Sequence, residues 1–337
     1  MRNETNLENL NAAFKKLAIE DNKVVFIGED IASPYEGAFK VEKGLQELIP
    51  DRVISTPISE ESFTGMAAGM AVRGYKPIVD LMFSDFMTLS FDIVLNFASK
   101  YPEMYGERKP FNMIIRSANG GYRGYGPTHS QSMQKFFMGM PNVCVYEMSP
   151  FHDNKQILDR MLNEKQTCIF LEEKTLYSRR VYRGSKVRDL FTLSFFGENN
   201  EWAYISIDEM SPDAYIICPG GMTEICLDAA EQLMMEEEIS IGILVPAKLY
   251  PCDLTAINEI IVGVHQIYIA EESTSGADWG DILLSLIYNL NNHRLNKKVI
   301  LLSSDDSVIP ASYYLENKML LSVDKIVDAI KSNLINI

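Results

Sequence analysis

The sequence predicts an α/β fold with two doubly wound, mainly parallel sheets, each in a domain of its own. Three observations lead to this prediction. The 337 residues are too many for one small core, at about 150 residues per domain. Strand-like and helix-like patterns alternate along both halves of the chain. Between residues 183 and 212 this alternation is interrupted.

The first half alternates apolar runs that are typical of buried strands with amphipathic runs that are typical of helices. We expect helices over 9–19, 61–74, 89–100 and 153–163, and strands over 23–27, 78–82, 113–115 and 168–172. Alternation of this kind favours a parallel sheet with helices on both faces. We therefore assign residues 1–182 to the first domain.

The second half repeats the pattern after an irregular stretch. Residues 183–212 contain Gly-Glu-Asn-Asn-Glu and Ser-Pro-Asp, which indicate turns, and we interpret them as the interdomain connection. The second domain, 213–337, is expected to have strands over 214–218, 240–245, 266–270 and 298–302, and helices over 223–237, 254–262 and 323–334.

Composition excludes several classes of protein. The net charge of −15 argues against a nucleic-acid partner, because such binding depends on clustered Lys and Arg. No run of about 18 apolar residues and no signal peptide is seen, so a cytoplasmic protein without a membrane span is expected. Five scattered cysteines without metal-ligand spacing predict buried, reduced thiols.

The stretch from residue 54 to residue 65 is the most informative in the chain. It presents Glu60 and Glu61 in a short polar loop, just before a run rich in Gly and Ala. A carboxylate beside small residues can approach a flat heterocycle closely. The doublet by itself, however, is better explained by two acids that stabilise the N-terminus of the following helix.

A set of motifs spread over nearly the whole chain resembles the beta subunits of the thiamine-diphosphate-dependent 2-oxo acid dehydrogenases (the pyruvate, branched-chain and acetoin enzymes). The resemblance implies a transketolase-like pyrimidine-binding domain followed by a transketolase C-terminal domain. The matching segments are Gly28-Glu29-Asp30, Gly37-Ala38-Phe39-Lys40-Val41, Gly44-Leu45, Thr56-Pro57-Ile58-Ser59-Glu60, Phe83-Ser84-Asp85-Phe86, Arg116-Ser117-Ala118-Asn119-Gly120 and His129-Ser130-Gln131-Ser132.

The resemblance assigns roles to individual residues. It implies that Glu60 activates the cofactor by holding a proton at the pyrimidine ring, and that Phe86 stacks on this ring. It implies that His129 assists acyl transfer to the lipoyl arm. Glu29 would help to bind the cofactor.

Other residues near these motifs have a simpler structural interpretation. Glu29, Asp30 and Arg116 are candidates for structural ion pairs, and Phe83 for a core residue. The remaining histidines, 152, 265 and 293, are expected on the surface or in the core.

One motif of these enzymes is missing. Thiamine diphosphate is anchored through a divalent metal at a Gly-Asp-Gly motif followed by Asn, and the nearest match, Gly280-Asp281-Ile282 with Asn289, is expected to begin an ordinary helix. We therefore expect an alpha partner that carries this motif and the Mg²⁺, in an α2β2 assembly that also meets a lipoyl acyltransferase.

A monovalent cation near Met113 and residues 161–166 is an option, although Glu164 and Gln166 replace the Asp and Asn of relatives that bind one. Gly139 stands where a histidine is common, and residues 245–249 lack a frequent arginine. Two alternatives to the lipoamide-dependent enzyme stay open. One is a divergent biosynthetic transketolase-like enzyme with a non-lipoyl acceptor, and the other is a non-catalytic scaffold subunit.

Overall fold

The computed structural model describes residues 4–105, 109–207, 210–263, 266–291 and 298–334. The chain forms two compact units. The first comprises residues 1–120, 136–148 and 152–181, and the second comprises 121–135, 149–151 and 182–337. The glycine-rich segment after residue 120 thus groups with the C-terminal half of the chain and not with its sequence neighbours.

The first unit is built on a parallel sheet. Its strands run in the order β5-β6-β4-β3-β1-β2, and every neighbouring pair is parallel. Strands β1, β4, β5 and β6 are buried along their whole length. The apolar runs in the sequence predict β1, β4 and β6, whereas β5 was not among the expected strands. The bounds are β1 (Val24–Glu29), β2 (Val53–Thr56), β3 (Lys76–Phe83), β4 (Met113–Asn119), β5 (Val143–Glu147) and β6 (Thr167–Glu173).

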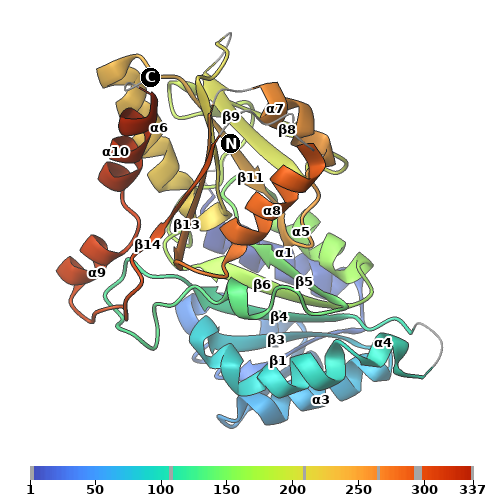
Figure 1. Cartoon of the computed structure of the whole chain (residues 1–337). Helices are drawn as coiled ribbons and strands as arrows, with labels where there is room; N and C mark the ends of the chain where they lie inside the picture. The colour runs from blue at the N-terminus through green and yellow to red at the C-terminus, as the bar shows by residue number, and fades with distance from the viewer. Residues whose placement is uncertain (1–3, 106–108, 208–209, 264–265, 292–297, 335–337) are drawn as a thin grey trace. The chain divides into compact units, whose positions relative to one another are not determined.

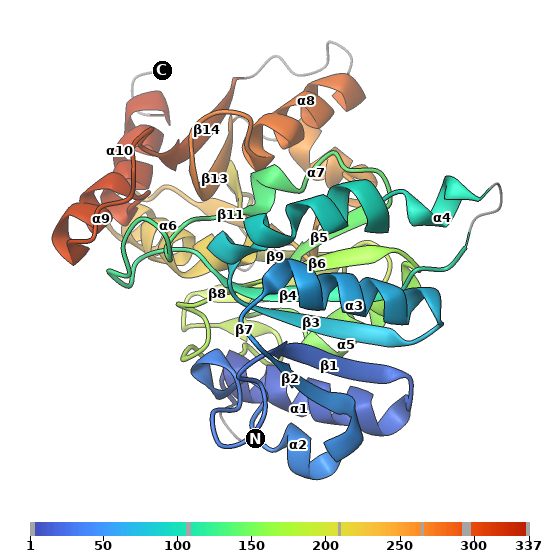
Figure 2. The same cartoon turned by 90° about the horizontal axis from the view of Figure 1, so that it is seen from below.

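Helices cover both faces of this sheet. Figure 2 shows α3 (Glu60–Val72) lying along β3, while α1 (Asn6–Glu20) packs with α5 (Asn154–Asn163). A Thr5–Glu8 capping box begins α1. The short helices are α2 (Leu45–Leu48) and α4 (Tyr101–Met104).

The helix expected over 89–100 has a less regular form. A 3₁₀ segment covers Ser84–Ser90, and a π-helical turn covers Ile93–Ala98. Such turns often occur at functional sites.

The second unit carries a mixed sheet of order β14-β13-β10-β11-β9-β8-β7. The first four strands in this order are parallel to one another, and the last three add on in antiparallel fashion. The bounds are β7 (Lys186–Val187), β8 (Phe191–Phe196), β9 (Trp202–Ile207), β10 (Ala214–Ile217), β11 (Ile241–Pro246), β13 (Gln266–Thr274) and β14 (Val299–Ser304), and a short strand β12 (Lys248–Tyr250) follows β11.

The segment 183–212, interpreted from the sequence as an irregular connection, contains the strands β7, β8 and β9. A hairpin joins β8 to β9 through Gly197, Asn199 and Asn200, all with positive φ. Antiparallel strands need only short turns, and β8 is buried at alternate positions for only part of its length. Its apolar pattern is therefore too weak to stand out beside the continuous runs of the parallel strands.

Helices flank the parallel part of the second sheet. In Figure 1, α6 (Thr223–Glu237) and α10 (Val323–Leu334) lie side by side on one face, and α8 (Trp279–Asn291) lies on the other. The α6 face forms a continuous apolar core that includes Leu227, Ile243 and Ile330. Two shorter helices, α7 (Asn258–Gly263) and α9 (Tyr313–Met319), complete the unit.

Two further expectations can be compared with this fold. Gly280-Asp281-Ile282 lies in the first turn of α8, so the prediction of an ordinary helix there is confirmed. None of the five cysteines, all within the described ranges, forms a disulfide; four are buried, and Cys252 is half-buried. Among the residues described, no helix is both long and apolar enough to cross a membrane.

Candidate functional site

Glu60 is placed by the junction between β2 and α3. It is the first residue of the helix, where the helix dipole favours a negative charge, and its side chain is 8% exposed, whereas Glu61 is exposed. Within the described ranges, no side chain or backbone group donates a hydrogen bond to the Glu60 carboxylate. The cap position, Ser59, bonds Ser62 through its hydroxyl at 2.8 Å. The two acids of the doublet are therefore not equivalent, and only Glu60 turns inward.

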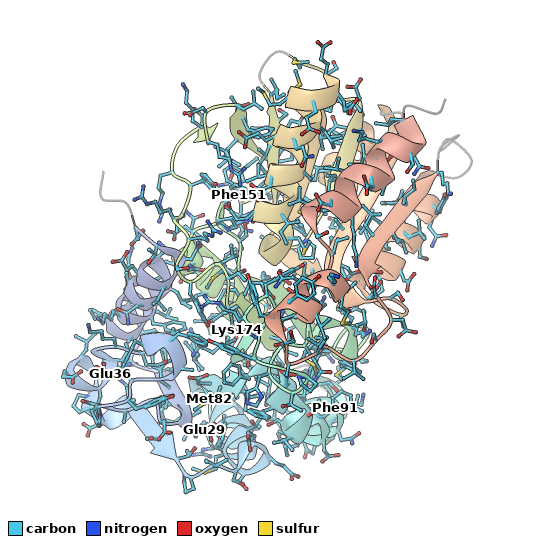
Figure 3. All side chains as sticks on the ribbon, turned by 90° about the vertical axis from the view of Figure 1, so that its left-hand side faces the viewer. Glu29, Glu36, Met82, Phe91, Phe151 and Lys174 are labelled. Carbon is cyan, nitrogen blue, oxygen red and sulfur yellow. The ribbon has the colours of Figure 1, made fainter. Side chains whose placement is uncertain are left out.

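Glu29 lies beside Glu60 at the carboxyl end of β1. Burial raises the pKa of the Glu29 carboxyl, and the charges of Glu60, Asp30 and Asp80 add to this shift. Its Oε2 atom is buried without a hydrogen-bond partner in the described part of the chain. Figure 3 labels Glu29 together with Met82, which comes from the paired strand β3. Ligands of parallel α/β sheets commonly bind at these carboxyl ends.

Phe86 lies in the 3₁₀ segment after β3 and is half-buried. Its ring meets the ring of Phe83 edge-on, with centroids 6.3 Å apart, and Phe83 meets Phe39 in the same way at 6.2 Å. Phe83 was expected in the core but is only half-buried, with the ammonium of the buried Lys174 5.6 Å from its ring centre. Phe83 is the last residue of β3, where the burial of the strand becomes partial.

Arg116 is the centre of a buried ion-pair network, as its interpretation as a structural residue predicts. Its Nη1 atom lies 2.6 Å from Oε1 of Glu42 and 2.9 Å from Oδ2 of Asp80, and its Nε atom lies 2.5 Å from Oε1 of Glu172. Tyr177 donates to Oε2 of Glu172 at 2.7 Å. The sequence did not single out the three acids, because they come from distant segments with no shared motif.

Glu29 and Asp30 do not join this network. Asp30 is exposed with a positive φ of 52°, and neither residue forms an ion pair with another described residue, which corrects the interpretation of both as ion-pair partners. The Arg116 guanidinium contacts three other acids instead. The unpaired Oε2 atom of Glu29 is therefore available to a ligand.

His129 belongs to the second unit and is half-buried in a turn. Its backbone N–H donates to the carbonyl of Gly126 at 3.2 Å, and its Nδ1 lies 3.0 Å from the hydroxyl of Thr128. Gly124 and Gly126 have positive φ values of 69° and 83°. This loop presents the imidazole from backbone conformations that favour glycine.

The remaining histidines and the candidate cation site can be described briefly. His152 is buried, and His265 and His293 lie outside the described residues. The side chains of Glu164 and Gln166 contact Tyr146 and Cys144, respectively. No group of three or more His, Cys, Asp or Glu that could hold a metal occurs in the portion of the chain that the structure describes.

The first unit carries polar groups whose chemistry suits a flat nitrogen heterocycle. Glu60 supplies a buried carboxylate with no intrachain donor, and Glu29 supplies a buried carboxyl with one unpaired oxygen. Phe86 adds an aromatic ring that is not fully buried. Buried acceptors without donors are costly unless a ligand completes their hydrogen bonds.

Comparison with protein families gives matches over both halves of the chain. Residues 5–179 match the transketolase pyrimidine-binding domain, and residues 203–326 match the transketolase C-terminal domain. The first match covers the strands and helices that carry Glu29, Glu60 and Phe86. The second begins within the segment that forms the strand β9.

Several curated relatives match nearly end to end. The chain is 31% identical over 329 residues to the pyruvate dehydrogenase E1 component subunit beta of Cyanidium caldarium, covering 96% of this chain and 95% of the relative. It is 28% identical to the acetoin:2,6-dichlorophenolindophenol oxidoreductase subunit beta of Bacillus subtilis, covering 94% and 93%. The mitochondrial pyruvate dehydrogenase E1 beta subunit of Saccharomyces cerevisiae is 30% identical over 269 residues, covering 79% and 71%.

Solved structures share the fold at lower identity. A split-gene transketolase, an inactive beta4 tetramer, superposes with a TM-score of 0.70 at 18% identity, and 98% of each chain is covered. The transketolase of Campylobacter jejuni gives 0.66 at 14% identity, and the match covers 98% of this chain but 47% of that one. These likenesses establish the two-domain α/β fold.

Proposed function

This chain belongs to the family of pyruvate and acetoin dehydrogenase beta subunits, and from that membership we propose that it is the beta subunit of a thiamine-diphosphate-dependent 2-oxo acid dehydrogenase. One observation carries the catalytic part of the proposal. Glu60 is buried at the first position of α3, and its carboxylate has no donor among the described residues. It is therefore the group best placed to accept a hydrogen bond from a ligand.

Bound thiamine diphosphate would supply the electron sink for the loss of CO₂ from a 2-oxo acid. Glu60 would hold a proton at the ring nitrogen opposite the amino group of the pyrimidine. Glu29, whose pKa is raised by burial and by the neighbouring charge of Glu60, would offer its unpaired Oε2 atom to the same ligand. Phe86 would contact the face of the pyrimidine ring.

His129 would act later in the reaction. An imidazole can donate a proton or a hydrogen bond near neutral pH, which suits the reductive acylation of a lipoyl disulfide. One sulfur would take the acyl group while the other leaves as a thiolate and takes a proton, and the broken S–S bond would supply the two-electron oxidation. The glycine-rich loop that carries it has the backbone freedom to approach a ligand. We propose lipoamide, carried by a lipoyl acyltransferase, as the acceptor.

The chain needs a partner for the other half of the cofactor. It lacks a Gly-Asp-Gly motif, so we propose that an alpha subunit holds the diphosphate through Mg²⁺ and that the two chains form an α2β2 heterotetramer. A monovalent cation bound by carbonyls near Met113 and residues 161–166 is a further part of the proposal. It is compatible with Glu164 and Gln166, whose side chains are engaged elsewhere.

A matched pair of variants tests the role of Glu60. In the enzyme reconstituted with an alpha chain that carries Gly-Asp-Gly, Glu60→Gln should reduce decarboxylation of a 2-oxo acid by about 10²–10⁴-fold, the range typical of a removed acid–base group. Glu61→Gln, which changes the exposed neighbour, should leave the rate within twofold. Equal rates for Glu60→Gln and the unmodified enzyme would support the scaffold alternative instead.

The acceptor is tested separately. The reconstituted pair is supplied with pyruvate and either a lipoylated domain or a panel of aldehydes, and the acylated or condensed product is measured by mass spectrometry. Acylation of the lipoyl arm is expected. Condensation with aldehydes, without acylation of the lipoyl domain, would assign the chain to the non-lipoyl biosynthetic alternative.

A further inference from the structure

We propose that Glu272 and Glu316 are positioning residues that hold the loop of residues 121–132 and thereby fix the imidazole of His129. This inference rests on the proposed function, because His129 is a reactive group only in that scheme. It goes beyond the function by assigning a task to two acids that the sequence motifs leave without one. All the contacts that carry it lie within the second unit.

Glu272 fixes the two ends of the loop. It lies in β13 and is 8% exposed. Its Oε1 atom accepts a hydrogen bond from the backbone N–H of Gly121 at 2.6 Å and another from the hydroxyl of Ser132 at 3.1 Å. One carboxylate therefore joins residues that are eleven positions apart and closes the loop on which His129 is carried.

Glu316 fixes the middle of the loop. It lies in α9 and is fully buried, and its Oε2 atom accepts the backbone N–H of Gly124 at 2.6 Å. Its Oε1 atom is buried with no hydrogen-bond partner in the described ranges. A fully buried acid is costly unless its hydrogen bonds repay the loss of water. Its place here is therefore best explained by the bond to Gly124.

Other contacts lie near these two anchors. Tyr122 donates its hydroxyl to the carbonyl of Leu321 at 2.7 Å, and Lys135, just beyond the loop, donates to the carbonyl of Thr274 at 3.0 Å. The Tyr122 bond joins two neutral groups, and the charge-assisted bond of Lys135 lies outside the loop. Hydrogen bonds to a carboxylate are roughly twice as strong as neutral ones, so the two glutamates should dominate the order within the loop.

The composition of the loop makes such anchors necessary. Gly121, Gly124 and Gly126 lie between its start and His129, and glycine loses more conformational freedom on ordering than any other residue. A catalytic group must be held to within about half an ångström of its productive position. Without the two carboxylates the imidazole would sample many positions.

The test uses the enzyme reconstituted with its alpha partner and thiamine diphosphate. Glu316→Ala removes the acceptor for Gly124, and Glu316→Gln keeps the side-chain size and one acceptor oxygen. Amide hydrogen exchange of residues 121–132 should rise about 10- to 100-fold in Glu316→Ala, the factor implied by the loss of a hydrogen bond to a charged group. Glu316→Gln should recover most of the protection. Glu259→Ala, an exposed acid in α7, should change nothing.

Kinetics then show whether the anchor acts through His129. The maximal rate of acyl transfer should fall about 10- to 100-fold in Glu316→Ala, while the affinity for thiamine diphosphate stays within twofold. When His129 is already replaced by Ala, Glu316→Ala should lower the rate of acyl transfer by less than twofold, because the imidazole that Glu316 positions is absent. A purely structural role would instead lower both rates by the same factor.

Three outcomes would overturn the inference. Unchanged exchange in the loop of Glu316→Ala would show that the acid does not order it. Multiplicative losses in the double variant would show that Glu316 and His129 act independently. If His129→Ala alone leaves acyl transfer unchanged, the proposed role of His129 fails together with the positioning role. Exchange would still show whether the acids hold the loop, so the two failures can be distinguished.

Discussion

Removal of the Arg116 guanidinium should strongly destabilise the first unit. This side chain is 2% exposed and supplies the cation that three buried acids contact, Glu42, Asp80 and Glu172. Arg116→Met keeps much of the apolar volume but leaves these acids without a cation. Breaking a buried ion pair from one side costs about 3–5 kcal/mol, and we expect a loss in this range.

The penalty should depend on pH. Burial raises the pKa of both Glu42 and Asp80, and the charge of Arg116 opposes this rise, so the pKa values climb further in the variant. A carboxyl whose pKa is higher in the folded state than in the unfolded state binds its proton more tightly when the protein is folded. It therefore stabilises the folded state at a pH below its unfolded-state pKa, and this stabilisation is lost as the pH rises through its folded-state pKa. Arg116→Met should therefore be less destabilised at pH 5.5 than at pH 8.

The assay must report on the first unit. Both tryptophans of the chain, Trp202 and Trp279, belong to the second unit, so their fluorescence serves as an internal control. Amide hydrogen exchange of β4 and β6 during urea titration measures the first unit directly. Arg73→Met, at an exposed position after α3, should lie within about 0.5 kcal/mol of the unmodified chain.

Two results would refute this account of the network. A loss below about 1 kcal/mol would mean that the carboxylates do not depend on Arg116. A penalty that grows as the pH falls would contradict the sign of the pKa shifts. Adding Glu42→Gln and Glu172→Gln to Arg116→Met should recover part of the lost stability, because fewer buried charges are then left unpaired.

Three further predictions concern single side chains. In thermal unfolding, Gly120→Ala should destabilise the chain by at least about 2 kcal/mol more than the control Gly139→Ala does. Both glycines have a φ near +80°, so the backbone strain is matched. A Cβ at Gly120 would overlap with a buried carboxylate, whereas at Gly139 nothing lies within 4 Å. Phe86→Ala should weaken thiamine diphosphate binding in titrations of the reconstituted enzyme by about 1–3 kcal/mol, and the exposed Phe136→Ala should not. Glu29→Gln should raise the melting temperature of the cofactor-free chain more at pH 8 than at pH 5. The pKa of Glu29 is raised, so its ionisation is costly in the folded state. An equal rise in melting temperature at the two pH values would contradict this.

The sequence alone determined the fold class and the position of the inward-facing acid. Continuous apolar runs can be satisfied only by strands buried on both faces, so β1, β4 and β6 were predictable as parallel strands. The helix α6 has the bounds that its amphipathic pattern predicts. Glu60 was selected over Glu61 by its motif, and it is the buried member of the pair.

Only the tertiary structure decided which polar groups meet. Arg116 and Glu42 are 74 positions apart, and Gly124 and Glu316 are 192 apart, so no local pattern could pair them. The strands over 183–212 were also hidden, because antiparallel strands that are buried on one face carry a weak apolar signal. The local pattern of apolar residues predicts which surface each segment buries. The partner of a buried charge, however, depends on which distant strands pack together.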